Sequence, residues 1–536
     1  MKTRNVFYIL MCLLSFSLAA CQEDANDWGV DPSHDRLFRT TSFEASKVAS
    51  TSILLSYNGV TSATQYVFEF SEDSLLFNSI VRTDVILADT LTPYTKGTSA
   101  VATEYRTLFE NLNGTTRYSV RVKAVDERTG MESGYVNLTF MTPDEQIFTK
   151  VVPGVTNVTL NWMEGAAATH LNYGELTSSD TIWTTRRQLT AEEQQSCKMV
   201  IDDLKPGTNY IAFIYNENAR RGSYKFKTLG SSSSEIVTMQ PGDDINQLLA
   251  DCAATGNGDV SLVFSGGNTY DLGKVTVPEG VQNLYLSGNV VGGVLPELKM
   301  SQLILSAPMK NIYFQYVDVD NELKSNFQVE INSANCFENI SFDGCTIRNI
   351  PRSLIRVNTG DAAIKGISIS NCIINNVGSG GYGLLNIGKA ASLESISITN
   401  STMIDMGDQL MDIRLVVDNI IISKSIFCNY TIGMGKLLRL DKQPKSISVT
   451  SMIFTGDNAG AKINSGNSDY SKYLSFAGCY LTSDFQQNDK PFTDAKVLSM
   501  TSEELFENPR AGDFHIKEGV IFEGDGKVGD PRWWKE

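Results

Sequence analysis

The stretch ISISNCII, residues 367–374, decides the fold of this 536-residue chain, because close variants of it recur through the C-terminal half. Its counterparts begin about every 27 residues and include ISFDGCTI at 340–347, ISITNSTM at 396–403 and ISVTSMIF at 447–454. The whole series begins at Leu284, Ile312, Ile340, Ile367, Ile396, Ile420, Ile447 and Leu474. A fixed period of this length is typical of a solenoid, in which one structural unit stacks on the next.

Each phrase has the pattern of a half-buried strand. Ile367 and Ile369 alternate with two serines, a period of two that indicates a strand and not a helix. No helical pattern separates the repeats, so the strands must stack in parallel as a β-helix. The residue that follows the alternating part is Gly or Asn in several phrases, and these types tolerate the left-handed backbone of a sharp turn. They are Gly344, Asn371, Asn400 and Gly478.

A further strand follows a variable loop in each repeat. Its phrases are LIRVN at 354–358, LLNIG at 384–388, LMDIR at 410–414 and LLRLD at 437–441. Three strands per repeat predict a triangular section. Residues 235–536 therefore resemble the right-handed pectate-lyase β-helix, and the helical pattern up to Cys252 resembles the N-terminal cap of that fold.

Two segments before the repeats show short alternating runs separated by turn signals, as antiparallel sandwiches do. Residues 40–143 contain LNGTTRY at 112–118, and residues 144–230 contain LKPGTNY at 204–210. Both motifs resemble the tyrosine corner of fibronectin type III domains. The predicted fold class is all-β, with two fibronectin type III-like sandwiches followed by a right-handed three-sheet parallel β-helix.

The N-terminus is typical of a targeting segment. Lys2 and Arg4 precede a short apolar run that ends in Leu-Ala-Ala-Cys21. This ending resembles the bacterial lipoprotein box, which implies that residues 1–21 hold a signal peptide and a lipidated Cys21. Residues 22–39 form a polar tether whose acidic start resembles the surface-export signal of Bacteroidota lipoproteins. We therefore predict an outer-membrane protein that is lipid-anchored and faces the exterior.

Charge and cysteine content exclude two classes of function. The formal net charge of −16 argues against nucleic-acid binding, which needs a basic surface. Apart from Cys12 and Cys21, seven cysteines remain, and they include no Cys-x-x-Cys pair, so neither a disulfide framework nor a zinc site is expected. Cys345, Cys372 and Cys479 share one position of the repeat and should point inward. A disulfide between Cys345 and Cys372, on neighbouring repeats, remains an alternative.

Charged residues concentrate on the outward face of the third strand. One predicted line contains Glu330, Arg356, Asn386, Asp412 and Arg439, and the line beside it contains Asn332, Asn358, Gly388, Arg414 and Asp441. The preceding loops add Arg348, Arg352, Tyr382, Asp405 and Asp408. In pectate-lyase-like proteins the corresponding sheet and loops form the polysaccharide groove. Four leucines are expected to face outward beside these lines: Leu354, Leu384, Leu410 and Leu437.

Two interpretations of these charges are open. Elimination from a uronic acid needs a cation to neutralise the carboxylate and a base for the adjacent proton. Asp405, Asp408 and Asp412 could hold Ca²⁺, and the resemblance implies that Arg356 or Arg439 serves as base or clamp. Alternatively, the signs alternate only so that stacked charges neutralise each other, which contributes about 0–1 kcal/mol per exposed pair.

The whole layout resembles a family of unknown function, Bacteroidota outer-membrane lipoproteins in which fibronectin type III domains precede a pectate-lyase-like β-helix. We predict a non-catalytic surface protein that binds an extended, acidic, pectin-type polysaccharide within a glycan-utilisation system. A Ca²⁺-dependent polysaccharide lyase is the alternative, and a scaffold for an outer-membrane glycan transporter is the third hypothesis. The binding or catalytic candidates are Arg348, Arg352, Arg356, Tyr382, Asn386, Asp412, Arg414, Arg439 and Asp441. Trp533 and Trp534 are interpreted as part of a C-terminal cap.

Overall fold

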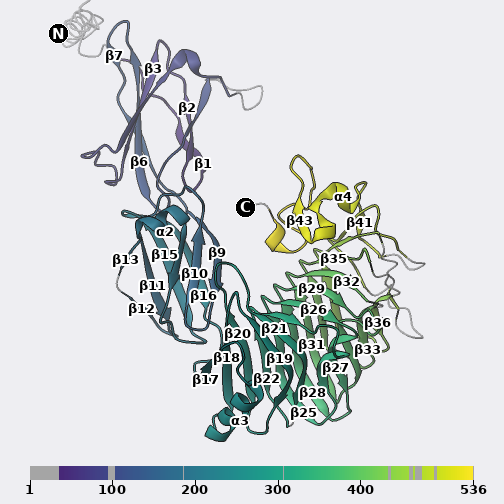
Figure 1. The fold of residues 1–536 in the computed structure, drawn as a ribbon. Helices are drawn as coiled ribbons and strands as arrows, with labels where there is room; N and C mark the ends of the chain where they lie inside the picture. Colours follow the sequence, from purple (N-terminus) through teal and green to yellow (C-terminus); the bar gives the residue numbers. More distant parts are fainter. Residues whose placement is uncertain are drawn as a thin grey trace, which may run out of the picture. The chain divides into compact units, whose positions relative to one another are not determined.

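The computed structural model describes residues 36–94, 103–184, 186–305, 307–407, 409–431, 436–457, 463–464, 474–487 and 492–534 (Figure 1). Nearly all of its regular structure is strand, so the all-β class is confirmed. The chain divides into two compact units, Met1–Gln146 with Ile214–Gly222, and Ile147–Phe213 with Ser223–Glu536. Among the described residues, no helix is long and apolar enough to cross a membrane.

The first sandwich packs a three-stranded sheet against a five-stranded one, as in a fibronectin type III domain. Its core contains the aromatic rings of Phe68, Phe70 and Phe109, which are almost wholly buried. The predicted tyrosine corner is present, since the hydroxyl of Tyr118 accepts a hydrogen bond of 3.0 Å from the backbone N–H of Asn113. The strands are β1 (Phe43–Val48), β2 (Ile53–Asn58), β5 (Glu104–Phe109), then β4 (Arg82–Leu87), β3 (Gln65–Ser71), β6 (Arg117–Asp126), β7 (Met131–Glu132) and β8 (Val136–Met141).

The second sandwich repeats this plan. The hydroxyl of Tyr210 accepts a hydrogen bond of 3.0 Å from the backbone N–H of Lys205, and Leu160 and Trp162 are buried. One sheet consists of β9 (Phe148–Pro153), β10 (Val158–Trp162) and β14 (Lys198–Ile201). The other consists of β11 (His170–Leu176), β12 (Thr181–Trp183), β13 (Arg187–Gln188), β15 (Asn209–Asn216) and β16 (Ala219–Lys227), and the helix α2 (Ala191–Ser196) precedes β14.

The remainder of the second unit is a parallel β-helix with three strand stacks, here called sheets 1, 2 and 3 (Figure 1). Sheet 1 contains β17 (Glu235–Thr238), β18 (Asp259–Ser265), β20 (Asn283–Asn289), β22 (Asn311–Gln315), β25 (Asn335–Asp343), β28 (Ala362–Ser370), β31 (Ser392–Thr399), β34 (Asn419–Ser423) and β37 (Ser446–Thr450). Sheet 2 contains β23 (Asp318–Asp320), β26 (Thr346–Ile350), β29 (Ile373–Val377), β32 (Thr402–Met406), β35 (Ile426–Cys428), β38 (Ile453–Thr455), β40 (Tyr480–Leu481) and β41 (Lys496–Val497). Sheet 3 contains β24 (Phe327–Ile331), β27 (Ser353–Asn358), β30 (Leu385–Lys389), β33 (Gln409–Ile413), β36 (Lys436–Leu440) and β39 (Ile463–Asn464).

Sheets 2 and 3 meet on the long strand β21 (Glu297–Leu305). Its first residues pair with β23, whereas Leu303 pairs with Val329 of β24, so one strand contributes to both faces. β19 (Thr269–Val277) pairs with its other edge. The predicted cap helix is α3 (Ile245–Thr255), whose N-terminus is capped by the Asp244 carboxylate. Its buried residues Leu249 and Cys252 pack onto the solenoid core, which closes the N-terminal end.

Identical positions of the repeat stack directly on one another. Ile340, Ile367, Ile396 and Ile420 are aligned in sheet 1, and each is at most 1% exposed. The predicted turn residues have left-handed backbones, with φ of 54° at Asn371. Tyr316, Lys424 and Ser451 adopt the same conformation, which residue type alone did not indicate. The repeat period therefore fixed the register correctly.

The four leucines of sheet 3 are buried in the core, so the prediction that they face outward was wrong. The cause is an irregularity where the strand begins. The backbone N–H groups of Leu354 and Ile355 both point to the carbonyl oxygen of Leu384, at 3.0 and 3.3 Å. Two consecutive side chains consequently face inward, and strict alternation fails at this corner.

The inward cysteines are free thiols in the structure, so the alternative of a disulfide between Cys345 and Cys372 is not realised. Both thiols are buried, as is that of Cys479. Burial raises the pKa of the Cys345 thiol well above its usual range. These residues thus act as small apolar side chains of the core.

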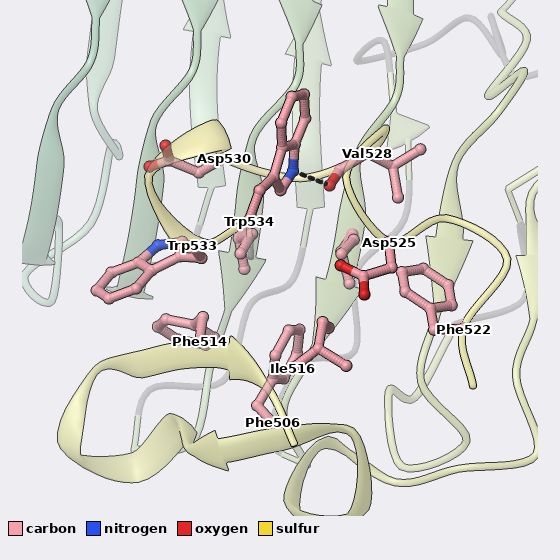
Figure 2. A pocket seen from close by; sticks show the side chains of 11 residues that line it. Phe506, Phe514, Ile516, Phe522, Asp525, Val528, Asp530, Trp533 and Trp534 are labelled. Carbon is pink, nitrogen blue, oxygen red and sulfur yellow. Dashed lines mark hydrogen bonds between the residues drawn. The ribbon is translucent and has the colours of Figure 1, made fainter. Parts of the chain in front are cut away.

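The C-terminal segment lies along the outer side of sheet 2. It comprises α4 (Ser502–Leu505), β42 (Phe506–Asn508), β43 (Asp513–Ile516) and the short helix η6 (Pro531–Trp533). Its apolar residues pack on Ile426 and Ile453, and the indole N–H of Trp533 donates to Thr402 Oγ1 at 2.8 Å. The indole N–H of Trp534 donates to the carbonyl oxygen of Val528, also at 2.8 Å (Figure 2). The structure thus places Trp533 on a lateral face, not over the end of the solenoid. The end is filled instead by stacked rings, including Phe476 and Phe492 at 4.3 Å.

The stability of the β-helix should depend on its inward columns, which are the rows of buried side chains that stack at one position of successive repeats. We expect Ile398→Ala, at a fully buried position of β31, to cost about 2–5 kcal/mol through lost burial and a cavity. Ser397→Ala, one residue away and facing outward, should change stability by less than about 0.5 kcal/mol. Urea unfolding of both variants, followed by circular dichroism, checks this, and equal effects would contradict the inward column.

Candidate functional site

The outward face of sheet 3 carries the predicted line of charges. The strand register places Glu330, Arg356, Asn386, Asp412 and Arg439 side by side on successive strands, which confirms the predicted alignment. The second line is shifted at one point, because Asn358 pairs with Lys389 and not with Gly388. The face is thus a ladder of polar and charged side chains on a rigid support.

Asp412 is the centre of this ladder, and its side chain is wholly buried. Its carboxylate accepts hydrogen bonds from Arg414 at 2.9 and 3.1 Å and from Asn386 Nδ2 at 3.3 Å, and Arg439 lies 3.6 Å away. The bond to Asp412 raises the pKa of Arg414. Arg439 also contacts Asp441, at 3.3 Å. The Asp412 carboxylate therefore holds the guanidinium groups of Arg414 and Arg439 in place, and it is not open to solvent.

A second cluster lies earlier on the same sheet and combines arginines with aromatic rings. The guanidinium carbon of Arg356 is 4.5 Å from the ring centroid of Phe327, and that of Arg352 is 5.3 Å from the ring of Tyr382. Glu330 is 3.8 Å from Arg356. Within the described residues, Arg352 has no carboxylate partner, whereas Arg356 faces Glu330 through an Nε that is buried and makes no hydrogen bond. Arg352 therefore keeps its guanidinium donors free for a ligand, whereas Arg356 is already paired with Glu330 and its Nε is buried.

Tyr382 owes its position to a glycine-rich loop, residues 378–383. A Cβ at Gly383 would overlap the carbonyl oxygen of Gln409, and one at Gly407 would overlap that of Gly378, so these backbones touch across neighbouring turns. The backbone N–H of Gly380 also donates to Pro351 O at 2.7 Å. Sequence reasoning missed this loop and Phe327. The glycine density of GSGGYG was the available signal for close backbone approach.

Arg348 does not belong to this face. It lies on β26 of sheet 2, where its guanidinium contacts three carboxylates: Glu297 at 2.5 Å, Asp318 at 3.0 Å and Asp320 at 2.6 Å. These acidic groups sit on the strands that precede β26 in the same stack. Arg348 thus neutralises the negative charge of these three carboxylates. For this residue the structure agrees with the neutralisation hypothesis.

The predicted Ca²⁺ ligands are not assembled by the described residues. The Asp405 carboxylate accepts hydrogen bonds from the backbone N–H groups of Tyr430 and Thr431, both at 2.8 Å, and Asp412 is paired with arginines. Asp408 lies outside the described residues. In the ranges that the structure describes, no three His, Cys, Asp or Glu side chains lie close enough to hold a metal. The calcium site remains a prediction.

A small apolar pocket under the C-terminal segment has a volume of about 10 Å³ (Figure 2). Phe506, Phe514 and Ile516 line it, and Asp525 carries an oxygen that is buried without a hydrogen-bond partner. Such a volume holds about one water molecule. This pocket is therefore a packing feature and no ligand site. The candidate ligand sites are the larger polar surfaces.

Comparison with known proteins gives one family match within the β-helix and matches to many solved structures. Residues 299–406 match the family described as a domain of unknown function, DUF4957. The match covers about a fifth of the chain and falls on the β-helix. No curated protein matches.

Two of the solved structures that are similar to part of the chain contain fibronectin type III domains. A segment of two fibronectin type III domains from chicken tenascin is 13% identical, with a TM-score of 0.23, covering 35% of this chain and 99% of that one. The FN1–FN3 domains of chicken CNTN1 are 12% identical, with a TM-score of 0.15, covering 36% of this chain and 66% of that one.

A buried carboxylate with two arginines should be structural. We expect Asp412→Asn to destabilise the β-helix by about 1.5–3 kcal/mol, because it removes the charge of a buried carboxylate that accepts hydrogen bonds from Arg414 and Asn386. Asp441→Asn, which changes a half-exposed partner of Arg439, should cost less than about 1 kcal/mol. Thermal unfolding of the two variants measures the difference. Equal melting temperatures would show that Asp412 has no structural role.

Proposed function

We propose that the outward face of sheet 3 binds an extended, acidic polysaccharide of pectin type without cleaving it. The observation that carries this proposal is the pair Arg352 and Arg356 beside Tyr382. Two cations, of which Arg352 has no carboxylate partner among the described residues, stand next to an aromatic ring on a rigid sheet. Guanidinium groups bind carboxylates through paired hydrogen bonds, and an aromatic ring offers an apolar surface to a sugar.

The spacing of the strands suits a polymer. Neighbouring strands of a sheet lie about 4.8 Å apart, so sheet 3 presents its side chains at regular intervals along the solenoid axis. Four guanidinium groups, from Arg352, Arg356, Arg414 and Arg439, share this face with three carboxylates, from Glu330, Asp412 and Asp441. The face is slightly basic in a chain whose net charge is −16, and this favours an anionic ligand at that place.

The state of the carboxylates supports binding without catalysis. Elimination requires a base within hydrogen-bond reach of the substrate proton. Asp412 is buried between arginines, and Asp405 accepts hydrogen bonds from the backbone of a neighbouring turn. The raised pKa of Arg414 opposes its use as a base, because its neutral form becomes rarer. A lyase would therefore have to use Arg356 or Arg439 as its base.

Affinity electrophoresis tests the proposal. The full chain, purified in a neutral detergent, is run through gels that contain polygalacturonate. We expect retardation of the native chain, and loss of most of this retardation in Arg352→Ala/Arg356→Ala, since each charge-assisted contact is worth about 1.5–3 kcal/mol. Lys310→Ala/Lys365→Ala removes the same charge near sheet 1 and should be retarded like the native chain.

The other functions give different outcomes in the same gels. Clearing of the polysaccharide stain around the native band would overturn non-catalytic binding in favour of a Ca²⁺-dependent lyase. Unchanged mobility in every acidic glycan would overturn binding altogether. That outcome would favour the hypothesis of a scaffold that docks on an outer-membrane glycan transporter.

We further propose that the chain is lipid-anchored through Cys21 on the exterior of the outer membrane. The support is the Leu-Ala-Ala-Cys ending of the targeting segment, which lies outside the described residues. Several acyl chains would anchor firmly, since each buried CH₂ contributes about 0.8 kcal/mol.

For the anchor, we expect Cys21→Ala to abolish labelling by radioactive palmitate and to release the protein from the membrane fraction. Cys12→Ala, in the apolar run of the same segment, should leave both unchanged. Palmitate labelling that survives Cys21→Ala would contradict the anchor.

A further inference from the structure

A cleft of about 560 Å³ lies between the second sandwich and the first turns of the β-helix, both of which belong to the same compact unit. One wall is the outer surface of β9, β10 and β14. The other is the corner between sheets 1 and 2, where Tyr316, Gly344 and Asn371 occupy the turn position of successive repeats. The volume falls in the range of about 300–1,000 Å³ that is usual for ligand sites.

Direct contacts between the sandwich and the solenoid fix the two walls. The backbone N–H of Val155 donates to Asn289 Oδ1 at 3.0 Å, and that of Gly230 donates to Gln315 Oε1 at 3.1 Å. Val155, Leu229 and Val263 form a buried apolar cluster at the same junction. Because polar and apolar contacts close the junction on one side, the cleft is a built feature of this unit.

The sandwich wall presents a row of cations. Lys150 and Lys198 both pair with Asn161 of the central strand β10, so the three side chains lie in one row across the sheet. Two strand spacings separate the lysines by about 10 Å. Arg532, from the C-terminal segment, adds a third cation, although its Nε is 2.8 Å from Asp530. Within the described residues, neither lysine has an ion-pair partner.

The solenoid wall adds no negative charge. No Asp or Glu of the described residues lines the cleft. The nearby Asp343 carboxylate is occupied by Ser370 Oγ at 2.6 Å and Asn371 Nδ2 at 2.7 Å. Burial raises the pKa of Tyr316, which keeps its hydroxyl neutral. Its ring, with Leu295 and Ile373, supplies apolar surface, and Asn371 supplies an amide.

We propose that this cleft binds an acidic disaccharide, with Lys150 and Lys198 on its carboxylate or sulfate groups and the wall of Tyr316 against a sugar ring. The anionic character rests on the cleft alone, and the choice of a saccharide rests on the proposed function of sheet 3. The cleft differs from sheet 3 in shape. It is enclosed on two sides and suits a short unit or a chain end, where sheet 3 suits an extended polymer.

Calorimetric titration of the full chain in neutral detergent tests this site, with digalacturonate, a sulfated disaccharide and neutral lactose as probes. We expect one of the two acidic disaccharides to bind with a stoichiometry of one and lactose not to bind. Lys150→Ala/Lys198→Ala should weaken binding about tenfold or more, since hydrogen bonds to charged groups contribute about 1.5–3 kcal/mol each. Lys225→Ala/Lys227→Ala, on β16 of the other sheet of the same sandwich, is the matched control and should bind normally.

The outcomes distinguish a failure of the cleft proposal from a failure of the function proposed for sheet 3. Binding of a disaccharide that Lys150→Ala/Lys198→Ala leaves unchanged, but that Arg352→Ala/Arg356→Ala abolishes, would overturn the cleft and retain the proposed function. Absence of binding by both acidic disaccharides would also overturn the cleft, whatever the polymer gels show. Polymer retardation that fails while cleft binding persists would overturn sheet 3 and leave the cleft as the anion site.

Discussion

The structure depends on one constraint, the fixed spacing of parallel strands in the β-helix. Backbone hydrogen bonds hold each strand about 4.8 Å from the next, so whatever occupies one position of the repeat must stack on its counterpart above and below. Inside, this stacks Ile340, Ile367 and Ile396 into a closed column from which water is excluded. A polar residue in such a column would be buried without partners, and this explains why the period of the sequence is so regular.

The same constraint governs the outside of the solenoid. Like charges stacked on adjacent strands repel, and sheet 3 meets this by setting Asp412 between Asn386 and Arg439, with Arg414 beside it. The neutralisation hypothesis therefore holds for part of these charges, and the binding hypothesis stays a proposal. Asp412 and Arg348 balance charges within the fold, whereas Arg352 and Arg356 lie on aromatic rings and Arg352 has no carboxylate partner among the described residues. The residues that balance charge within the fold thus differ from those that are proposed to bind a ligand.

The features that could be predicted from the sequence are those encoded by a repeated local pattern, and the features that were missed depend on single irregularities or long-range contacts. The strand register, the tyrosine corners and the cap helix followed from local patterns that each repeat or module shows again. The leucines at the start of the sheet 3 strands were misplaced, because an irregularity that turns two consecutive side chains inward leaves no trace in apolar periodicity. The place of Trp533 and the row of Lys150 and Lys198 depend on contacts between distant segments, which no local pattern encodes.

The central claim is that sheet 3 is the surface on which an acidic polymer lies. The most direct measurement is a crystal structure of the chain with bound hexagalacturonate. The account predicts an intact oligosaccharide along the outward face of sheet 3, with carboxylates on Arg352 and Arg356 and a sugar ring near Tyr382. Density for the oligosaccharide on any other face, or a shortened product with an unsaturated end, would contradict it.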